Sequence, residues 1–315
     1  MSLRKVLVFG PTGGVGSAVA RTAHSHGHKV FLAMRDTSKS IPGLTTTEER
    51  SSGRYERVQA DLAQPDSVRT AASKSGATRA FIYAALGSSP DHMRSTAEAL
   101  KAAGTKYVVL LSSFSVQGDI RAIPPTNFIG YSHAQVEVSL EEVFGPRGYV
   151  AVRPSFFASN SFWWQRQIVE DGEVKWAFPD FKFDYLSPDD IGAVAGTILA
   201  GAVEGEQENP VPLAGPETDL TVAGAIETIS KVVNKPVKVT KVTPEEHIQV
   251  LIVKSGLPEP LAKGLTGDLV AASENQDIIH APLTQEMRFN VEKYLKRPPA
   301  RFSEWVEQNK DQFTV

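Results

Sequence analysis

The sequence VLVFGPTGGVGSAVAR, at residues 6–21, decides which fold this chain is expected to adopt. A short apolar run leads into glycines at positions 10, 13 and 16, and then into small residues. This pattern predicts a strand, a tight turn and a helix N-terminus. Glycine lets a ligand approach the backbone, and the free N–H groups of a helix start attract negative charge. We therefore expect the turn to hold a dinucleotide pyrophosphate, with contacts from Gly10, Thr12, Gly13, Val15 and Gly16.

The spacing of these glycines is Gly-x-x-Gly-x-x-Gly, whereas the commonest dinucleotide-binding turns have Gly-x-Gly-x-x-Gly. The position of the motif between a predicted strand and a predicted helix strengthens the assignment. The alternative is a glycine-rich turn that only reverses the chain.

The composition fits one large α/β domain, or one domain with an additional lobe. The chain has 315 residues, of which 41% are hydrophobic, and a net charge of −3. This charge argues against direct binding to nucleic acid or to an anionic membrane. No apolar run is long enough for a membrane-spanning helix, and residues 1–5 do not resemble a signal peptide. The absence of cysteine excludes disulfides and thiolate catalysis. We expect a cytoplasmic protein.

Strand-like and helix-like segments alternate through the first half of the chain. Apolar runs predict strands at 29–34, 56–59, 80–83, 107–111 and 149–153. Helices are expected to begin at 64–66 and to span 92–103 and 131–144, and the polar stretch 36–53 is expected to be a loop or a distorted helix. Helices between consecutive buried strands imply right-handed crossovers and a parallel sheet.

The predicted fold class is therefore α/β, a doubly wound parallel sheet of the Rossmann type with a smaller C-terminal α+β lobe. We expect a dinucleotide-binding core at residues 1–155. A substrate lobe is expected to take most of residues 156–315, with some segments that return to the Rossmann sheet. In this second part the pattern predicts helices at 188–201, 222–233 and 244–255, and a strand at 237–242.

Several short motifs, in their order and separation, resemble those of the NmrA-like family of atypical short-chain dehydrogenase/reductase proteins. The motifs are the glycine turn 10–16, Asp61-Leu62, 111–113, 152–157 with Asn160, 190–192 and 256–258. The resemblance implies NAD(P) bound across the C-terminal edge of the strands, with Pro154 and Phe156 at the cofactor, and a lobe that closes a substrate cleft. The family includes reductases of small molecules, and also proteins that bind dinucleotides as redox sensors without catalysis.

The end of the second predicted strand indicates which dinucleotide is preferred. An NAD enzyme places Asp or Glu there, whereas an arginine accepts the extra phosphate of NADP. Arg35 matches the phosphate-facing arginine of the family, and Lys39 follows it closely. We therefore expect NADP(H) to be preferred, with NAD(H) as the alternative. Either a carboxylate of Asp36 directed at the ribose, or a solvated role for both cations, would weaken this preference.

Further cofactor contacts are expected after the third and fourth strands. In related proteins the Asp61-Leu62 position contacts the adenine, although an aspartate that caps the next helix explains Asp61 nearly as well. Ala84 and Ala85 offer small side chains beside the nicotinamide ribose, and the alternative is a plain turn.

Common short-chain reductases use a Tyr-x-x-x-Lys pair on the helix after the fifth strand, with a serine near the end of that strand. The tyrosine gives a proton to the substrate carbonyl, and the lysine holds the ribose. Ser113 and Tyr131 occupy the matching positions, but Gln135 replaces the lysine. Gln135 lies on the same helix face as Tyr131 and can hydrogen-bond the ribose, yet it supplies no charge. This favours reduction over oxidation, or no redox turnover, and a packing role for Tyr131 is the alternative. His133 is expected to be exposed.

The segment 156–185 is rich in aromatic residues. Substrates of a doubly wound sheet bind outside the carboxyl ends of the strands, where aromatic walls suit a flat, apolar ligand. The residues expected to contact substrate are Phe157, Trp163, Trp164 and Tyr185. Packing in the core, or against a partner subunit, is the alternative for these rings.

His24, His26 and His28 lie close together at the predicted end of the first helix. Histidines interact favourably with a helix C-terminus, and Gly27 between them is typical of a helix end. We predict no metal site.

Together these features predict an NADPH-dependent reductase that reduces a C=O, C=C or C=N bond of an apolar or aromatic small molecule by hydride transfer. A non-catalytic NAD(P)-sensing regulatory protein, and a redox-neutral isomerase or cyclase, are the alternatives. The expected partner is the small-molecule substrate, with no direct nucleic-acid partner and no membrane. A homodimer or a regulatory protein partner is left open.

Overall fold

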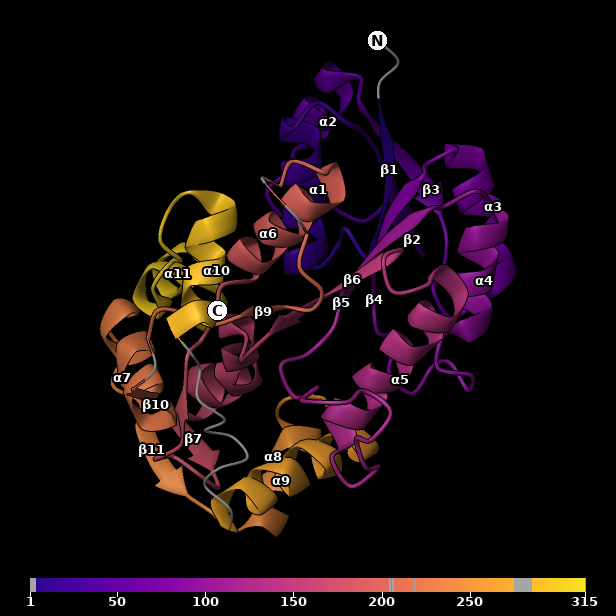
Figure 1. Ribbon diagram of the computed structural model, residues 1–315. Coiled ribbons are helices and arrows are strands. Elements are labelled where there is room, and N and C mark those ends of the chain that lie inside the picture. Colours follow the sequence, from indigo (N-terminus) through magenta and orange to yellow (C-terminus); the bar gives the residue numbers. More distant parts are fainter. Residues whose placement is uncertain (1–3, 204, 206, 218, 275–284, 315) are drawn as a thin grey trace. The chain divides into compact units, whose positions relative to one another are not determined.

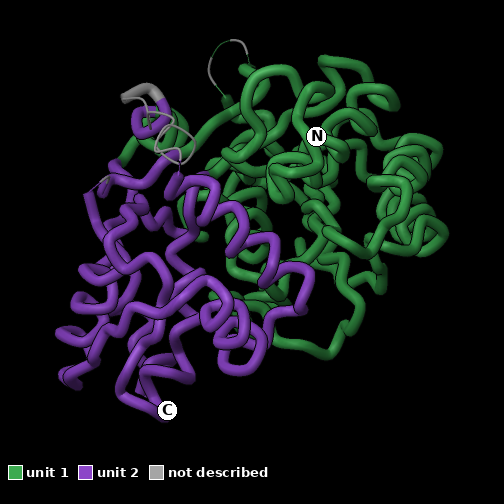
Figure 2. The backbone as a smooth tube through the Cα atoms, turned by 90° about the horizontal axis from the view of Figure 1, so that it is seen from below, with its two compact units in different colours: residues 1–154, 188–213, 290–297 green, residues 155–187, 214–289, 298–315 purple. Residues whose placement is uncertain are grey.

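The computed structural model describes residues 4–203, 205, 207–217, 219–274 and 285–314 (Figure 1). The chain divides into two compact units that alternate along the sequence (Figure 2). Unit 1 takes its residues from 1–154, 188–213 and 290–297, and unit 2 from 155–187, 214–289 and 298–315. Each unit is therefore assembled from segments that are far apart in the sequence.

Unit 1 is built on a parallel sheet whose described strands have the order β3-β2-β1-β4-β5-β6-β9. These strands are β1 Lys5–Phe9, β2 Lys29–Met34, β3 Tyr55–Gln59, β4 Arg79–Tyr83, β5 Tyr107–Leu111, β6 Tyr149–Pro154 and β9 Val211–Leu213. In the centre of the sheet, Val8 of β1 lies opposite Leu32 of β2 and Phe81 of β4. The chain winds outward in both directions from β1 and β4. This order confirms the predicted α/β, doubly wound fold.

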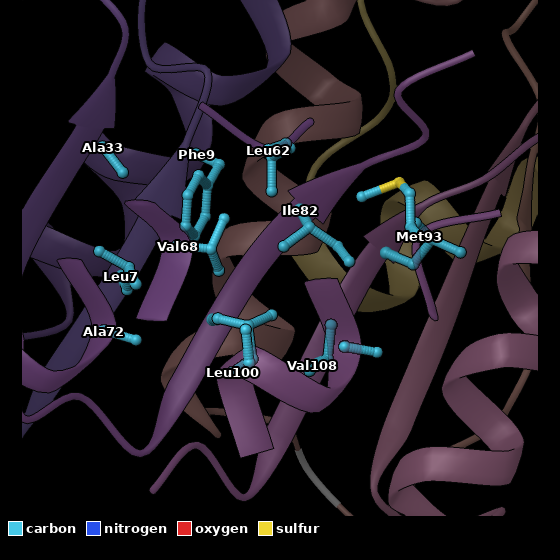
Figure 3. Close-up of a cluster of buried hydrophobic side chains, with 14 of the residues drawn as sticks. Leu7, Phe9, Ala33, Leu62, Val68, Ala72, Ile82, Met93, Leu100 and Val108 are labelled. Carbon is cyan, nitrogen blue, oxygen red and sulfur yellow. The ribbon is translucent and has the colours of Figure 1, made fainter. Parts of the chain in front are cut away.

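Helices cover both faces of this sheet (Figure 1). The helices of unit 1 are α1 Gly14–Ser25, α2 Thr46–Ser52, α3 Pro65–Ser75, α4 Arg94–Ala102, α5 Phe128–Phe144, α6 Pro188–Ala200 and part of α10 Gln285–Leu295. Alternate strand residues such as Leu7 and Ile82 point toward the face covered by α3, α4 and α5, where Val68 and Leu100 meet them (Figure 3). Each of these four side chains is no more than 1% exposed. Burial of one such side chain contributes about 1.5–3 kcal/mol.

On the other face, α1 and α6 approach each other closely because α6 has glycines at the contact. A Cβ on Gly196 would lie 2.7 Å from the Cβ of Thr22, and one on Gly192 would collide with the carbonyl oxygen of Val15. The absence of side chains at both positions lets the two backbones pack directly. Residues 188–200 thus belong to unit 1 although they follow the first segment of unit 2.

Unit 2 combines short strands with helices around an aromatic core. Its elements are a 3₁₀ helix at Ala158–Trp164, a π-helical turn at Gln167–Asp171, β7 Glu173–Trp176, β8 Lys182–Phe183, β10 Leu220–Thr221, α7 Val222–Val232, β11 Lys238–Lys241, α8 Pro244–Val253, α9 Glu259–Glu274, α11 Phe302–Gln308 and a final 3₁₀ turn at Lys310–Phe313. β7 pairs with β11 in parallel, and β8 pairs with β10 in the antiparallel direction. Trp164, Trp176, Tyr185 and Phe302 are no more than 1% exposed and form the centre of this core.

Most predicted elements are present, with differences that have local causes. The strands predicted at 29–34 and 107–111 coincide with β2 and β5, and β11 confirms the strand predicted near 237–242. The stretch 36–53 contains a regular helix, α2, which a reciprocal pair of hydrogen bonds between Thr45 and Glu48 begins. Helix α5 begins at Phe128 rather than 131, because Asn127 caps it by accepting the N–H of Gly130 at 2.9 Å.

Candidate functional site

The glycine turn between β1 and α1 is held by its own backbone. Gly10 has a φ of +67°, which favours glycine, and its N–H donates to the carbonyl of Ala33 in β2 at 3.1 Å. The Gly13 N–H donates to the Gly10 carbonyl at 3.1 Å. A Cβ on Gly16 would collide with that same carbonyl oxygen. The fold itself therefore requires glycine at positions 10 and 16.

Gly13 is different, because the protein leaves room for a side chain there. A Cβ on Gly13 would meet the Gly10 carbonyl oxygen at 3.6 Å, an ordinary contact, and its φ of −95° and ψ of 160° are open to any residue. Gly13 is also the N-cap of α1, and both it and Thr12 are exposed. Val15 has a buried side chain and can offer only its backbone. The structure thus places open space and helix-start N–H groups together, as anion binding requires.

The turn lies where the winding of the sheet reverses. β1 and β4 are neighbours, and the chain continues to β2 and β3 on one side and to β5 and β6 on the other. Ligands of open α/β sheets bind outside the carboxyl ends of the strands at this switch point.

The loop after β2, residues 35–45, carries two cations near the turn. Arg35 and Lys39 are exposed, and neither has an ion-pair partner among the residues that the structure describes. Asp36 is engaged locally, since its Oδ1 accepts the N–H of Ser38 at 2.9 Å and the Ser38 hydroxyl at 2.6 Å. These hydrogen bonds lower the pKa of Asp36. The Asp36 carboxylate, which the sequence analysis considered as a ribose ligand, is therefore turned toward its own loop.

Two arginines outside this loop hold its backbone. Arg57 of β3 donates to the carbonyls of Thr37 at 2.6 Å and Lys39 at 2.8 Å, while Glu49 of α2 binds the same guanidinium at 2.7 Å. Arg21 of α1 donates to the carbonyl of Pro42 at 2.7 Å. The sequence did not indicate either contact, because both arginines read as ordinary surface charges. Arg57 and Arg21 thus bind the backbone of the loop rather than the side chains of Arg35 and Lys39.

The other predicted cofactor residues lie at the ends of β3 and β4. Asp61 does not cap α3, whose N-cap is Gln64; its Oδ1 accepts the N–H of Ala63 at 3.0 Å in the preceding turn. The Leu62 side chain is buried in the core drawn in Figure 3, so any ligand contact has to come from its backbone. Ala84 and Ala85 are half-buried at the end of β4.

The candidate catalytic residues belong to α5 and to the loop after β5, two segments that pack on each other. The first turn of α5 packs on this loop, since a Cβ on Gly130 would lie 2.6 Å from the Ser115 carbonyl oxygen. Ser113 lies in the loop, and its hydroxyl oxygen accepts the Ser115 N–H at 3.2 Å. Tyr131 is half-buried against the cluster of Val116, Ile123 and Ala134, and Gln135 lies one turn further along α5.

Two histidines were not predicted correctly from the sequence: His133 was expected to be exposed, and His92 was not expected near Tyr131. His133 is half-buried rather than exposed; its Nδ1 lies 2.9 Å from the Ile129 carbonyl oxygen, and burial lowers its pKa. His92, from the loop after β4, meets the Tyr131 ring edge-to-face with 6.0 Å between ring centroids. Only the tertiary fold brings His92 to this helix, so no sequence pattern marks it.

A buried ion pair anchors α5 beneath these residues. Glu137 is 1% exposed and binds Arg153 of β6 through two contacts, at 2.9 and 2.5 Å. Glu137 also accepts the Ser112 hydroxyl at 2.5 Å, and Arg153 donates to the Val116 carbonyl at 3.0 Å. The network ties α5, the end of β5 and β6 together, and a buried pair of this kind is costly to break. In the sequence, Glu137 is indistinguishable from a surface charge of a helix.

Pro154, at the end of β6, and the residues that follow it have different partners. The Pro154 carbonyl accepts the N–H of Phe114 within unit 1. Phe156 belongs to unit 2, where its ring stacks on Phe183 at 4.0 Å and its N–H donates to the buried carboxylate of Asp184 at 3.1 Å. Phe157 and Trp163 are half-buried.

Trp164 and Tyr185 are fully buried, so their observed role is packing and their burial does not support the expected substrate contact. The Tyr185 ring packs on Phe302 with 4.6 Å between centroids, and burial raises its pKa well above the usual range.

His24 stacks on Tyr55 with 4.3 Å between ring centroids. Among the described residues no group of three or more His, Asp or Glu side chains is arranged to hold a metal ion. Across the same residues, no helix combines the length and the apolar character needed to cross a membrane.

Comparison with known proteins adds to this geometry. The sequence profile of the NmrA-like family matches residues 2–306. The chain is 38% identical to the nitrogen metabolite regulation-like protein bik4 of Gibberella fujikuroi, over 96% of both chains. It is 25% identical to a (4-alkanoyl-5-oxo-2,5-dihydrofuran-3-yl)methyl phosphate reductase of Streptomyces griseus, over 98% of this chain and 99% of the other.

Among solved structures, the fold is similar to that of the NADPH-dependent quinone oxidoreductase QOR2 of Escherichia coli in complex with NADPH. The TM-score is 0.71 at 19% identity, over 96% of this chain and 99% of the other. The profile match and the fungal relative both cover nearly the whole chain, and the chain belongs to the NmrA-like family.

Proposed function

We propose that the protein is an NADPH-dependent reductase of an apolar or aromatic small molecule. The observation that carries this proposal is the open space at Gly13, where the fold itself does not require a glycine. This space lies at the N-terminus of α1, beside the point between β1 and β4 where the winding of the sheet reverses. A pyrophosphate fits such a place, because glycine allows close approach and the helix start is electropositive.

Arg35 and Lys39 supply the positive charge for a phosphate on the adenosine ribose. They have no ion-pair partner among the described residues, whereas Asp36 is occupied by Ser38. NADPH fits this arrangement better than NADH, because the additional phosphate on the adenosine ribose of NADPH matches the two cations. The NADPH complex of the similar quinone oxidoreductase supports the same cofactor.

For the chemical step, the bound NADPH supplies the hydride. In this proposal the Tyr131 hydroxyl gives a proton to the reduced acceptor atom, and the Ser113 hydroxyl donates a hydrogen bond to it. Gln135 donates a hydrogen bond to the ribose. Unit 2 is proposed as the substrate lobe, with Phe157 and Trp163 as contacts, since both rings keep some exposed surface. The names of the quinone oxidoreductase and the furan phosphate reductase support a reductase.

The second candidate is a protein that senses NADP(H) without turning it over. Gln135 favours it, because no lysine charge supports Tyr131, and so does the name of the fungal relative. Titration with NADPH and NADH, followed by assays of NADPH oxidation with a panel of quinones and aromatic ketones, separates the candidates. Binding with turnover of a panel member supports the reductase; binding without turnover, together with capture of a protein partner, favours the sensor.

Arg35→Ala is expected to weaken NADPH binding by at least about tenfold and to leave NADH binding nearly unchanged. The variant loses a charge-assisted contact with the ribose phosphate, which is worth about 1.5–3 kcal/mol. Calorimetric titration with each dinucleotide measures the difference. Arg69→Ala removes an exposed charge from α3 and serves as the control. Equal losses for both dinucleotides would move the phosphate assignment away from Arg35.

Arg57→Lys is expected to weaken NADPH binding by about two- to tenfold, with a smaller effect on NADH. Lysine cannot hold Glu49 and the carbonyls of Thr37 and Lys39 together, and each lost bond is worth about 0.5–1.5 kcal/mol. The same titrations apply, with Arg50→Lys on the exposed side of α2 as the matched control. Unchanged NADPH affinity would show that the loop backbone keeps its shape without Arg57.

A further inference from the structure

Tyr83, the last residue of β4, lies across the glycine turn. A Cβ on Gly10 would be only 2.7 Å from Cε1 and 3.2 Å from Cδ1 of the Tyr83 ring, so the ring rests on the bare backbone of Gly10. The residue is nevertheless 37% exposed, which makes Tyr83 one of the few exposed large hydrophobic residues of the described chain. In the parallel pairing of β1 with β4, Val8 lies opposite Phe81, so that Gly10 and Tyr83 each follow this pair by two residues.

The position of this ring is the one where a ligand is expected. β1 and β4 are the strands at which the winding reverses, and the crevice beyond their carboxyl ends is the ligand site of open α/β sheets. Gly10 leaves the space that the ring uses, and the turn then continues to the exposed Gly13. Tyr83 therefore lies beside the glycine turn, at the carboxyl ends of the two strands where the winding reverses.

The surroundings of the Tyr83 hydroxyl point to the adenosine side of the crevice. Among the described residues this hydroxyl has no hydrogen-bond partner. Partial burial raises the pKa of Tyr83, while the charge of Arg35 lowers it and that of Asp61 raises it. Both charges are thus near the ring, and both follow strands on the β2/β3 side of the switch point. At neutral pH the phenol is a neutral donor beside an unpaired guanidinium.

We propose that Tyr83 is a specificity-determining residue for the phosphorylated ribose of the cofactor. Its hydroxyl donates a hydrogen bond to the 2′-phosphate that Arg35 binds, and its ring packs against the adenosine ribose. A rigid aromatic donor and a guanidinium then hold the phosphate from two strands, β4 and β2. This inference rests on the proposed function, because it assumes that NADP(H) occupies the crevice.

The test compares three probes by calorimetric titration: NADPH, NADH and 2′,5′-ADP, which carries the phosphorylated ribose without the nicotinamide. Tyr83→Phe removes only the hydroxyl and is expected to weaken NADPH and 2′,5′-ADP by about tenfold, and NADH by less than about twofold. Tyr83→Ala removes the ring as well and is expected to weaken all three probes. Tyr107→Phe, at the opposite end of the sheet, is the matched control.

Combination with Arg35→Ala shows whether the two residues share the phosphate. If they do, the losses from Tyr83→Phe and Arg35→Ala are expected to be non-additive for NADPH. Circular dichroism and thermal unfolding establish that each variant is folded before its affinity is compared.

The possible results separate this inference from the proposed function. If the wild-type protein binds none of the probes, the proposed function fails. If the wild type binds NADPH and Tyr83→Phe binds it equally well, only the inference is overturned. Equal losses of NADPH and NADH affinity in Tyr83→Phe would place the contact on a part that both cofactors share. Tighter binding by Tyr83→Ala would show that the ring obstructs the site. Either result also overturns the inference.

Discussion

The Gly13→Val variant is expected to keep its fold and to lose most of its affinity for both NADPH and NADH. Inside the protein the new side chain has room, since the nearest atom to a Cβ at this position is the Gly10 carbonyl oxygen at 3.6 Å. The φ of −95° and ψ of 160° lie in the region that β-branched residues favour. The valine instead fills the space outside α1 that the pyrophosphate needs, so we expect affinity to fall by about a hundredfold or more, or about 2.8 kcal/mol.

Calorimetric titration with both dinucleotides measures the loss, and thermal unfolding checks that the fold is intact. Gly16→Val is the informative comparison, because a Cβ there collides with the Gly10 carbonyl oxygen. That variant is expected to unfold at a much lower temperature, whereas Gly13→Val, which only puts a poorer N-cap residue before α1, is expected to lose much less. Wild-type affinity in Gly13→Val would place the pyrophosphate elsewhere and remove the main support for the proposed function.

Tyr131→Phe is expected to lower turnover by about 10²–10⁴-fold while NADPH affinity stays nearly unchanged. The substitution removes the proposed proton donor and keeps the ring, which packs on the cluster around Val116 and meets His92 edge-to-face. Gln135→Lys is expected to make the oxidative direction measurable at neutral pH, because a lysine charge stabilises a tyrosinate. Gln135→Ala is expected mainly to weaken cofactor binding.

These effects are measured as kcat and KM for a substrate found in the panel, with Tyr107→Phe as the control for a lost hydroxyl far from the site. Full turnover in Tyr131→Phe would remove this residue from the mechanism. The proton would then come from water or from the substrate itself.

The sequence predicted the parts of the fold that have strong local patterns. Strands β2 and β5 are apolar runs between polar segments, so their bounds could be predicted to the residue. Strand β9 could not, since it has three residues and its partner β6 lies far away in the chain. The two-residue strands β8 and β10 likewise carry no periodic signal.

The candidate site divides in the same way. The glycine turn and Arg35 follow directly from a motif and from the end of a strand. Tyr83 could not be found, because in the sequence it is one more aromatic residue of a buried strand. Glu137 escaped notice because only its pairing with Arg153 of β6 distinguishes it from a solvated helix residue. Pairing across the sheet, rather than local pattern, creates both features.

The interruption of unit 1 by a segment of unit 2 affects how the chain folds while it is synthesised. When residues 1–154 have left the ribosome, α1 still lacks α6 and the outer edge of β6 still lacks β9. At about 5–20 residues per second, several seconds pass before residues 188–213 emerge. During that time an apolar helix face and an unpaired strand edge are open to wrong partners. We therefore expect the growing chain to be open to aggregation until Gly192 and Gly196 can reach α1.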